Sequence, residues 1–193
     1  MFRYFLLYKP FGMLSQFSRE GDIRSLADLE FSFPRDVYPV GRLDADSEGL
    51  LLLTNDNQLK TRLLEPRHRH YRTYYVQVEG LITDEACEKL SKGIPISING
   101  KSYQTLPARA VAIDEPNLPV RTPPIRFRQN IPTSWVSISL YEGKNRQVRR
   151  MTAAVGFPTL RLVRWAISST LLGTMQPGEV REVDGKELLK KIL

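Results

Sequence analysis

The sequence predicts an α+β fold in which helices flank a mixed, mostly antiparallel central sheet. Stretches with strand character and stretches with helix character follow one another irregularly, without the regular alternation that builds a parallel α/β sheet. An unbroken run of four leucines at residues 50–53 also follows a glycine and precedes a polar turn, which predicts a strand buried on both faces. The length of 193 residues suits one domain, with room for two lobes.

The first part of the chain predicts two strands and two helices. Residues 2–8 are aromatic and aliphatic and end at Lys9-Pro10, so they predict a strand that proline stops. Residues 23–29 predict a short helix. The four-leucine run is the second strand, and the polar residues 55–57 after it are candidates for the N-cap of a helix that continues through Leu64 and ends near Pro66.

The rest of the chain predicts further strands and helices around one long loop. Residues 73–80 alternate and end in glycine, which predicts a strand, and acidic residues after Thr83 mark the first turn of a helix. Asn99-Gly100 predicts a hairpin turn after a strand at residues 96–98. Residues 114–133 contain five prolines and three arginines, which predicts a loop, because proline cannot donate to a sheet. The other predicted elements are strands at residues 108–113, 134–141 and 159–167, helices at residues 145–155 and 186–193, and a turn-rich segment at residues 173–183.

Composition limits the partners and the location of the protein. The formal net charge of +7 favours a polyanionic partner over a neutral small molecule. Cys87 is the only cysteine, so no disulfide can form within the chain, and a reducing, cytoplasmic location is expected. No stretch approaches the roughly 20 apolar residues of a membrane span, and the apolar start is too short for a signal peptide.

The polar turn before the four-leucine run is the first candidate site. It carries one arginine and three acids: Arg42, Asp44, Asp46 and Glu48. A loop that a buried strand supports can hold a charge in a fixed position. The acids nearly match a calcium loop, but its last position is Asn55 instead of a bidentate glutamate, and the flanks predict strand. Two histidines without partner cysteines predict no zinc site, and Ser47 lacks the glycine elbow and histidine base of a serine hydrolase.

A second candidate site is basic. In the helix predicted at residues 145–155, Arg146, Arg149 and Arg150 fall on one side, and the next strand adds Arg161 and Arg164. Two interpretations are open. The arginines form either a solvated face or a surface that follows RNA phosphates, with backbone donors of residues 143–145 at the helix start. The positive charge and a basic segment at residues 67–72 favour the second interpretation.

Tyr74 and Tyr75 point to opposite faces of their predicted strand. Each is either a core residue or, since the basic segment comes directly before them, a ring that stacks on an unstacked base.

Four motifs occur in order along the chain. The central one is Gly41-Arg-Leu-Asp-x-Asp-x-Glu-Gly-Leu-Leu-Leu-Leu-Thr-Asn-Asp56. It is preceded by Lys9-Pro-x-Gly12 and followed by Arg72-Thr-Tyr-x-Val-x-Val-x-Gly80. The last is Glu142-Gly-Lys-Asn-Arg-Gln-Val-Arg-Arg-Met151, with Leu162-x-Arg164 and Gly178-x-x-Arg181 downstream. Together they resemble the motifs of the RsuA-type pseudouridine synthases over nearly the whole chain. Ser168 departs from the glycine that this family often has there, which affects only the local backbone.

This resemblance implies the pseudouridine synthase fold with a central active-site cleft. It also implies an enzyme that detaches uracil from its ribose, turns it and rejoins it through C5 without a cofactor. Asp44 matches the essential aspartate, which either attacks C1′ or takes a proton from the sugar. Arg149 matches the arginine that keeps this carboxylate charged against desolvation, and Tyr74 matches the tyrosine that packs on the target base. Asp46 and Glu48 are then supporting residues.

The charge and the resemblance together predict six RNA-binding residues: Arg42, Lys9, Lys144, Arg146, Arg150 and Arg164. Arg42 would fill the stack that a flipped nucleotide leaves. Most of the family carries an S4 domain, and here none is expected before residue 2, which resembles one member that acts on the large ribosomal subunit. The expected partner is therefore ribosomal RNA, namely 23S rRNA or its precursor, bound by a monomer that needs no metal. The loop at residues 114–133 would supply some of the missing S4 contacts.

Two other functions stay open. A nucleoside or DNA glycosylase would also place an aspartate against a sugar carbon, but it would release free uracil. A non-catalytic rRNA-binding or ribosome assembly factor would keep the fold and lose little of its role when Asp44 is replaced.

Overall fold

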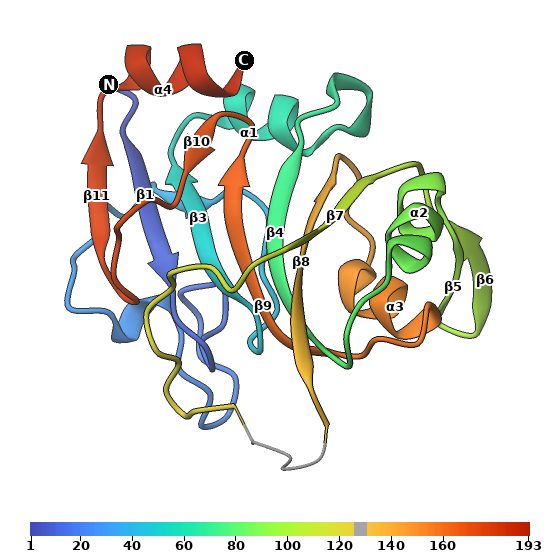
Figure 1. Cartoon of the computed structure of the whole chain (residues 1–193). Coiled ribbons are helices and arrows are strands. Elements are labelled where there is room, and N and C mark those ends of the chain that lie inside the picture. Colours follow the sequence, from blue (N-terminus) through green and yellow to red (C-terminus); the bar gives the residue numbers. More distant parts are fainter. Residues whose placement is uncertain (126–130) are drawn as a thin grey trace. The chain divides into compact units, whose positions relative to one another are not determined.

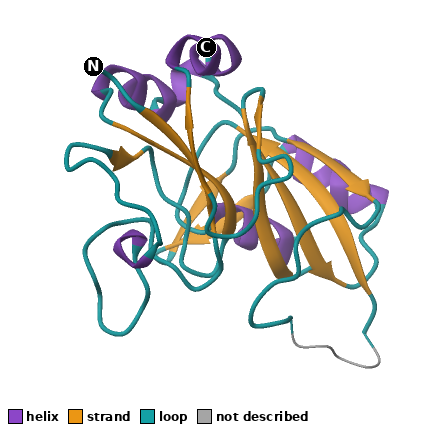
Figure 2. Cartoon of the chain, turned by 90° about the vertical axis from the view of Figure 1, so that its left-hand side faces the viewer, coloured by secondary structure: helices purple, strands orange, loops and turns teal. Residues whose placement is uncertain are grey.

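The computed structural model describes residues 1–125 and 131–193 (Figure 1). They divide into two compact units. Unit 1 consists of Met1–His70 and Val163–Leu193, and unit 2 consists of Tyr71–Leu162. Strands form most of the regular structure in each unit, and the helices are short (Figure 2). No helix among the described residues is long and apolar enough to cross a membrane.

The sheet of unit 1 is mixed. Its strands are β1 (Tyr4–Lys9), β2 (Tyr38–Pro39), β3 (Glu48–Thr54), β10 (Thr170–Leu171), β11 (Val180–Val183) and the second half of β9 (Thr159–Ile167). β3 lies between β1, which is antiparallel to it, and β9, which is parallel to it. β11 pairs antiparallel with the other side of β1. One parallel pair among antiparallel neighbours confirms the predicted fold class.

β3 is buried along its whole length, as the four-leucine run predicts. On one face, Leu51 and Leu53 pack in a cluster with Phe5 and Leu7 of β1. Gly49 has φ +108°, and a Cβ atom built on it would lie 2.4 Å from the carbonyl oxygen of Arg164 on β9. Only glycine fits a strand whose neighbour's backbone approaches so closely.

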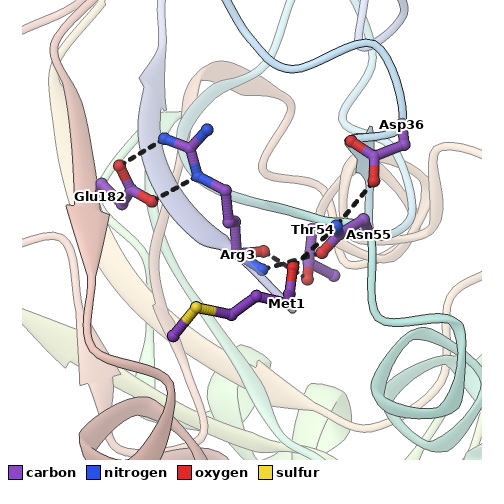
Figure 3. Close-up of polar contacts among 6 residues, drawn as sticks. All are labelled: Met1, Arg3, Asp36, Thr54, Asn55 and Glu182. Carbon is purple, nitrogen blue, oxygen red and sulfur yellow. Dashed lines mark hydrogen bonds and ion pairs between the residues drawn. The ribbon is translucent and has the colours of Figure 1, made fainter.

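Polar contacts tie the carboxyl end of β3 to the start of the chain (Figure 3). Thr54 Oγ1 donates to the carbonyl oxygen of Arg3 at 2.7 Å, and Asn55 accepts from the backbone N–H of Arg3 at 2.8 Å. Asn55 also donates to Asp36 at 2.8 Å. The Arg3 guanidinium forms two parallel bonds of 2.7 Å with Glu182 on β11. These contacts hold the N-terminus against both β3 and β11.

Unit 1 contains helices α1 (Asn57–Leu64) and α4 (Gly185–Ile192) and two short 3₁₀ turns, η1 (Leu26–Asp28) and η2 (Pro66–His68). Asp56 caps α1 by accepting from two backbone N–H groups, which confirms the predicted N-cap. The helix predicted at residues 23–29 is only the η1 turn. β11 was not predicted within the turn-rich segment at residues 173–183. It is short and half exposed, so its pairing with β1 decides its conformation.

Unit 2 contains an antiparallel sheet of β4 (Arg72–Glu79), β8 (Thr133–Leu140) and β7 (Arg109–Ile113), with β8 in the middle. Helices α2 (Asp84–Lys92) and α3 (Gln147–Ala154), together with hairpin β5 (Pro95–Ile98) and β6 (Lys101–Gln104), complete the unit. The hairpin turns at Asn99-Gly100 as predicted, with φ +50° and +77°. A single core joins the sheet to the helices through residues such as Val76, Leu90, Ile138 and Met151.

The loop predicted at residues 114–133 is partly described. Residues 114–125 form neither helix nor strand, as predicted, and residues 126–130 lie outside the described residues. The loop ends one residue earlier than predicted, because Thr133 already begins β8. The buried side chain of Arg161 donates to the carbonyl oxygen of Pro119 at 2.9 Å and so anchors this loop within unit 2. Its proposed RNA contacts stay a prediction.

Candidate active site

Asp44 lies in unit 1, half-buried in a loop that leads directly into β3. The residues on either side of it are held by the segment that follows β1. The backbone N–H of Gly12 donates to the carbonyl oxygen of Ala45 at 2.8 Å. The Ser15 hydroxyl donates to the carbonyl oxygen of Leu43 at 2.8 Å and accepts from its N–H at 3.0 Å. The backbone around Asp44 is therefore fixed on both sides, although it belongs to neither a helix nor a strand.

Lys9 is 0% exposed, so the prediction of an RNA contact by this residue is wrong. Its ammonium group donates to the carbonyl oxygens of Met13 at 2.7 Å and Pro10 at 2.9 Å, and Ala45 lies at 3.5 Å. Burial lowers the pKa of Lys9 to about 7, against the opposing effect of nearby carboxylates, chiefly that of Glu48. Lys9 is thus a buried amine inside unit 1, and its bonds brace the Asp44 loop and the segment before it.

The lowered pKa of Lys9 gives a pH-dependent stability. Between about pH 7 and 10 the unfolded chain holds this proton and the folded chain does not, so stability rises with pH. Below pH 7 both states hold it. The free energy of unfolding of the wild type relative to Lys9→Met should therefore rise by up to about 1.4 kcal/mol per pH unit in this window. Urea unfolding at several pH values measures it, and parallel curves for the two proteins would contradict it.

Arg164 is also buried, at 4% exposure, and its Nε donates to the carbonyl oxygen of Leu50 at 2.6 Å. A guanidinium held inside the sheet cannot reach a phosphate outside it, so the structure contradicts a direct RNA contact by this side chain. Arg164 instead joins β9 to β3 next to Gly49. Arg42, in contrast, is exposed beside the Asp44 loop, and its RNA contact stays a prediction.

Unit 2 carries the other two residues predicted to be catalytic. Tyr74 is half-buried on β4, opposite Ile138, and packs against the core of this unit. Arg149 is half-buried in α3. Because Asp44 belongs to unit 1, the ion pair between Asp44 and Arg149, the packing of Tyr74 on a base and the central cleft stay predictions.

The predicted stripe of arginines on α3 is only partly correct. The helix begins at Gln147, and Arg146 precedes it in the left-handed conformation with φ +52°, so Arg146 is not on the helical face. It is exposed, as is Lys144, whose ammonium lies 4.7 Å from the ring centroid of Tyr103. The Arg150 guanidinium donates to the carbonyl oxygens of Asn145 and Ser97. Arg150 thus helps to hold the turn before α3, and the RNA contacts of these three residues stay predictions.

The buried carboxylate of Glu142 organises this turn, a role that could not be predicted from its place in the last motif. One oxygen accepts from the N–H of Leu106 at 2.8 Å and from the Gln147 side chain at 2.5 Å. The other accepts from the Tyr103 hydroxyl at 2.6 Å, which helps to raise the pKa of Tyr103 to about 12. The Lys144 N–H donates to Gln147 at 2.9 Å, so this predicted backbone donor is already used.

The basic segment at residues 67–72 is partly neutralised by its neighbours. Arg67 and His68 both lie against the carboxylate of Glu65, and Arg72 donates to the carbonyl oxygen of Tyr141 at 2.7 Å. Within residues 1–125 and 131–193, no three His, Cys, Asp or Glu side chains are placed to hold a metal ion.

Comparison with known proteins agrees with the four motifs. The family of RNA pseudouridylate synthases matches residues 3–154. Ribosomal large subunit pseudouridine synthase E of Vibrio parahaemolyticus is 49% identical over 175 residues, which cover 91% of this chain and 71% of that protein. The protein of the same name in Xanthomonas campestris is 46% identical over 182 residues, which cover 94% of this chain and 95% of that protein. A crystal structure of a pseudouridylate synthase has a TM-score of 0.81 at 27% identity, over 100% of this chain and 74% of that one. The chain therefore belongs to the RNA pseudouridylate synthase family.

Proposed function

We propose that this pseudouridine synthase modifies a specific uridine of 23S rRNA or of its large-subunit precursor. Relatives that share nearly half of their residues with it over most of both chains are named for the large ribosomal subunit. The net charge of +7 suits a polyanionic substrate. The enzyme would act as a monomer in the cytoplasm.

Asp44 is the proposed catalytic carboxylate. The observation that supports this role is the bracing of Leu43 and Ala45 on either side of it, because a reacting group must be held to within a fraction of an ångström. In the isomerisation, the bond between N1 and C1′ breaks and a bond between C5 and C1′ forms. The C5 proton is lost and N1 gains one, so no co-reactant is needed. Asp44 would either bond to C1′ or take a proton from the sugar.

The proposed roles of the remaining residues follow from their chemistry. An Arg149 guanidinium beside Asp44 would keep the carboxylate ionised as water is excluded. The Tyr74 ring would pack on the target base, and the exposed Arg42 would occupy the space in the RNA stack after the nucleotide flips out.

Mapping pseudouridines in rRNA from cells with and without this protein tests the proposed substrate. One position in 23S rRNA should lose its pseudouridine when the protein is absent and regain it when the wild type is supplied. Supply of Asp44→Asn should not restore it. Loss of the modification only from small-subunit rRNA or from transfer RNA would refute the proposed substrate.

A further inference from the structure

We propose that Ser15 is a positioning residue for the catalytic carboxylate of Asp44. This inference rests on the proposed role of Asp44. Ser15 lies outside the four motifs and is 28 positions away from the residue that it contacts. Its hydroxyl is the side-chain group that holds the Leu43 peptide, from which Asp44 continues.

The Ser15 hydroxyl acts as both donor and acceptor in its contact with Leu43. The hydroxyl donates a hydrogen bond to the Leu43 carbonyl oxygen at 2.8 Å, and its oxygen accepts one from the Leu43 N–H at 3.0 Å. Ser15 is 4% exposed and Leu43 is 7% exposed, so little water can replace either bond. A hydroxyl is suited to this place because it is donor and acceptor at once and reaches only a short distance.

These two bonds bear directly on where Asp44 points. The Leu43 carbonyl belongs to the same peptide plane as the Asp44 nitrogen, so fixing that oxygen fixes the plane. The next peptide is held by the Ser47 N–H, which donates to the Asp44 carbonyl oxygen at 3.0 Å, and the peptide after that by the Gly12 N–H, which donates to the Ala45 carbonyl oxygen. Without Ser15 the Asp44 backbone keeps its anchors on the carboxyl side and loses both on the amino side.

Ser134 in unit 2 makes the same pair of bonds and provides a matched control. Its hydroxyl donates to the Gly80 carbonyl oxygen and accepts from the Ile82 N–H, both at 2.8 Å. Ser15→Ala and Ser134→Ala therefore each remove one hydrogen bond to a backbone carbonyl oxygen and one from a backbone N–H. They differ in the backbone that the hydroxyl holds: Ser15 is buried and bonds to Leu43, next to Asp44, whereas Ser134 is half-buried and bonds to Gly80 and Ile82.

The experiment measures steady-state pseudouridine formation on an rRNA substrate, RNA affinity and melting temperature for the full chain and its variants. We expect both alanine variants to melt at lower temperatures. Ser15→Ala should lower kcat by about 10- to 100-fold with RNA affinity unchanged, because a displacement of about 1 Å costs about that much. Ser134→Ala should keep kcat within about twofold of the wild type. Ser15→Cys, which keeps a weak donor and acceptor, should fall between Ser15→Ala and the wild type.

Equal values of kcat for Ser15→Ala and Ser134→Ala would overturn the inference, since Ser15 would then serve stability alone. If Ser15→Ala does not fold, the same comparison between Ser15→Cys and Ser134→Cys decides the question. Full activity of Asp44→Asn would instead refute the proposed role of Asp44, whatever the serine variants do, so the two failures are distinguishable.

Discussion

Asp44→Asn is expected to lower the rate of pseudouridine formation by more than about 10³-fold, with RNA affinity within about twofold of the wild type. Asparagine has the shape of aspartate, but it can neither bond to C1′ nor accept the sugar proton. Asp44 is half-buried in a loop whose backbone contacts the substitution leaves in place. Single-turnover kinetics on an rRNA fragment, with binding measured separately, gives both quantities.

Asp46→Asn is the matched control, because Asp46 is a half-buried carboxylate in the same loop. It should reduce the rate far less than Asp44→Asn. Residual activity of Asp44→Asn near that of the wild type would exclude a catalytic role for this carboxylate. Free uracil in the wild-type reaction would show hydrolysis instead of isomerisation.

Gly49→Ala is expected to lower the free energy of unfolding by at least about 3 kcal/mol. The added methyl group would lie 2.4 Å from the Arg164 carbonyl oxygen and 2.6 Å from its nitrogen. These are backbone atoms of a paired strand, so they cannot move aside as a flexible side chain would. The positive φ of Gly49 adds further strain for alanine. Urea unfolding of the two proteins measures the difference.

Gly173→Ala separates the two causes of this loss. Gly173 has φ +60°, but nothing lies within 4 Å of a Cβ atom built on it. Its substitution should therefore cost only the conformational strain, about 1–2 kcal/mol. Equal losses for the two alanine variants would mean that β9 does not approach β3 as closely as described.

The sequence predicted the fold best where local pattern and tertiary environment agree. The four-leucine run predicted β3, and β9 was predicted with its observed bounds, residues 159–167. Asp56 was among the expected N-caps of α1. β11 was missed, and β6 was implied only by the hairpin turn at Asn99-Gly100 and had no predicted bounds. Both strands are short and at least half exposed, so their partners and not their composition make them strands. A pattern within one segment cannot reveal that dependence.

The candidate site was predictable only in part, since charge alone does not tell whether a cation is buried. Lys9 and Arg164 looked like phosphate contacts, yet both donate to backbone carbonyl oxygens inside unit 1. The positions of Asp44, Tyr74 and Arg149 came from the resemblance to a family. Nothing in the sequence around Ser15 indicated its role, because its contact with Leu43 forms only when residues far apart in sequence come together in the fold.

The strand that lies parallel to β3, β9, is synthesised late in translation. Leu50 accepts from an arginine that follows it by 114 positions, so most of the chain must leave the ribosome before this bond can form. A nascent chain stalled before residue 159 would already contain Asp44 and Arg149 but would lack the strand beside Gly49. Copies that stop before residue 159 should therefore be unable to modify RNA, because they lack the strand that pairs with β3 beside Gly49.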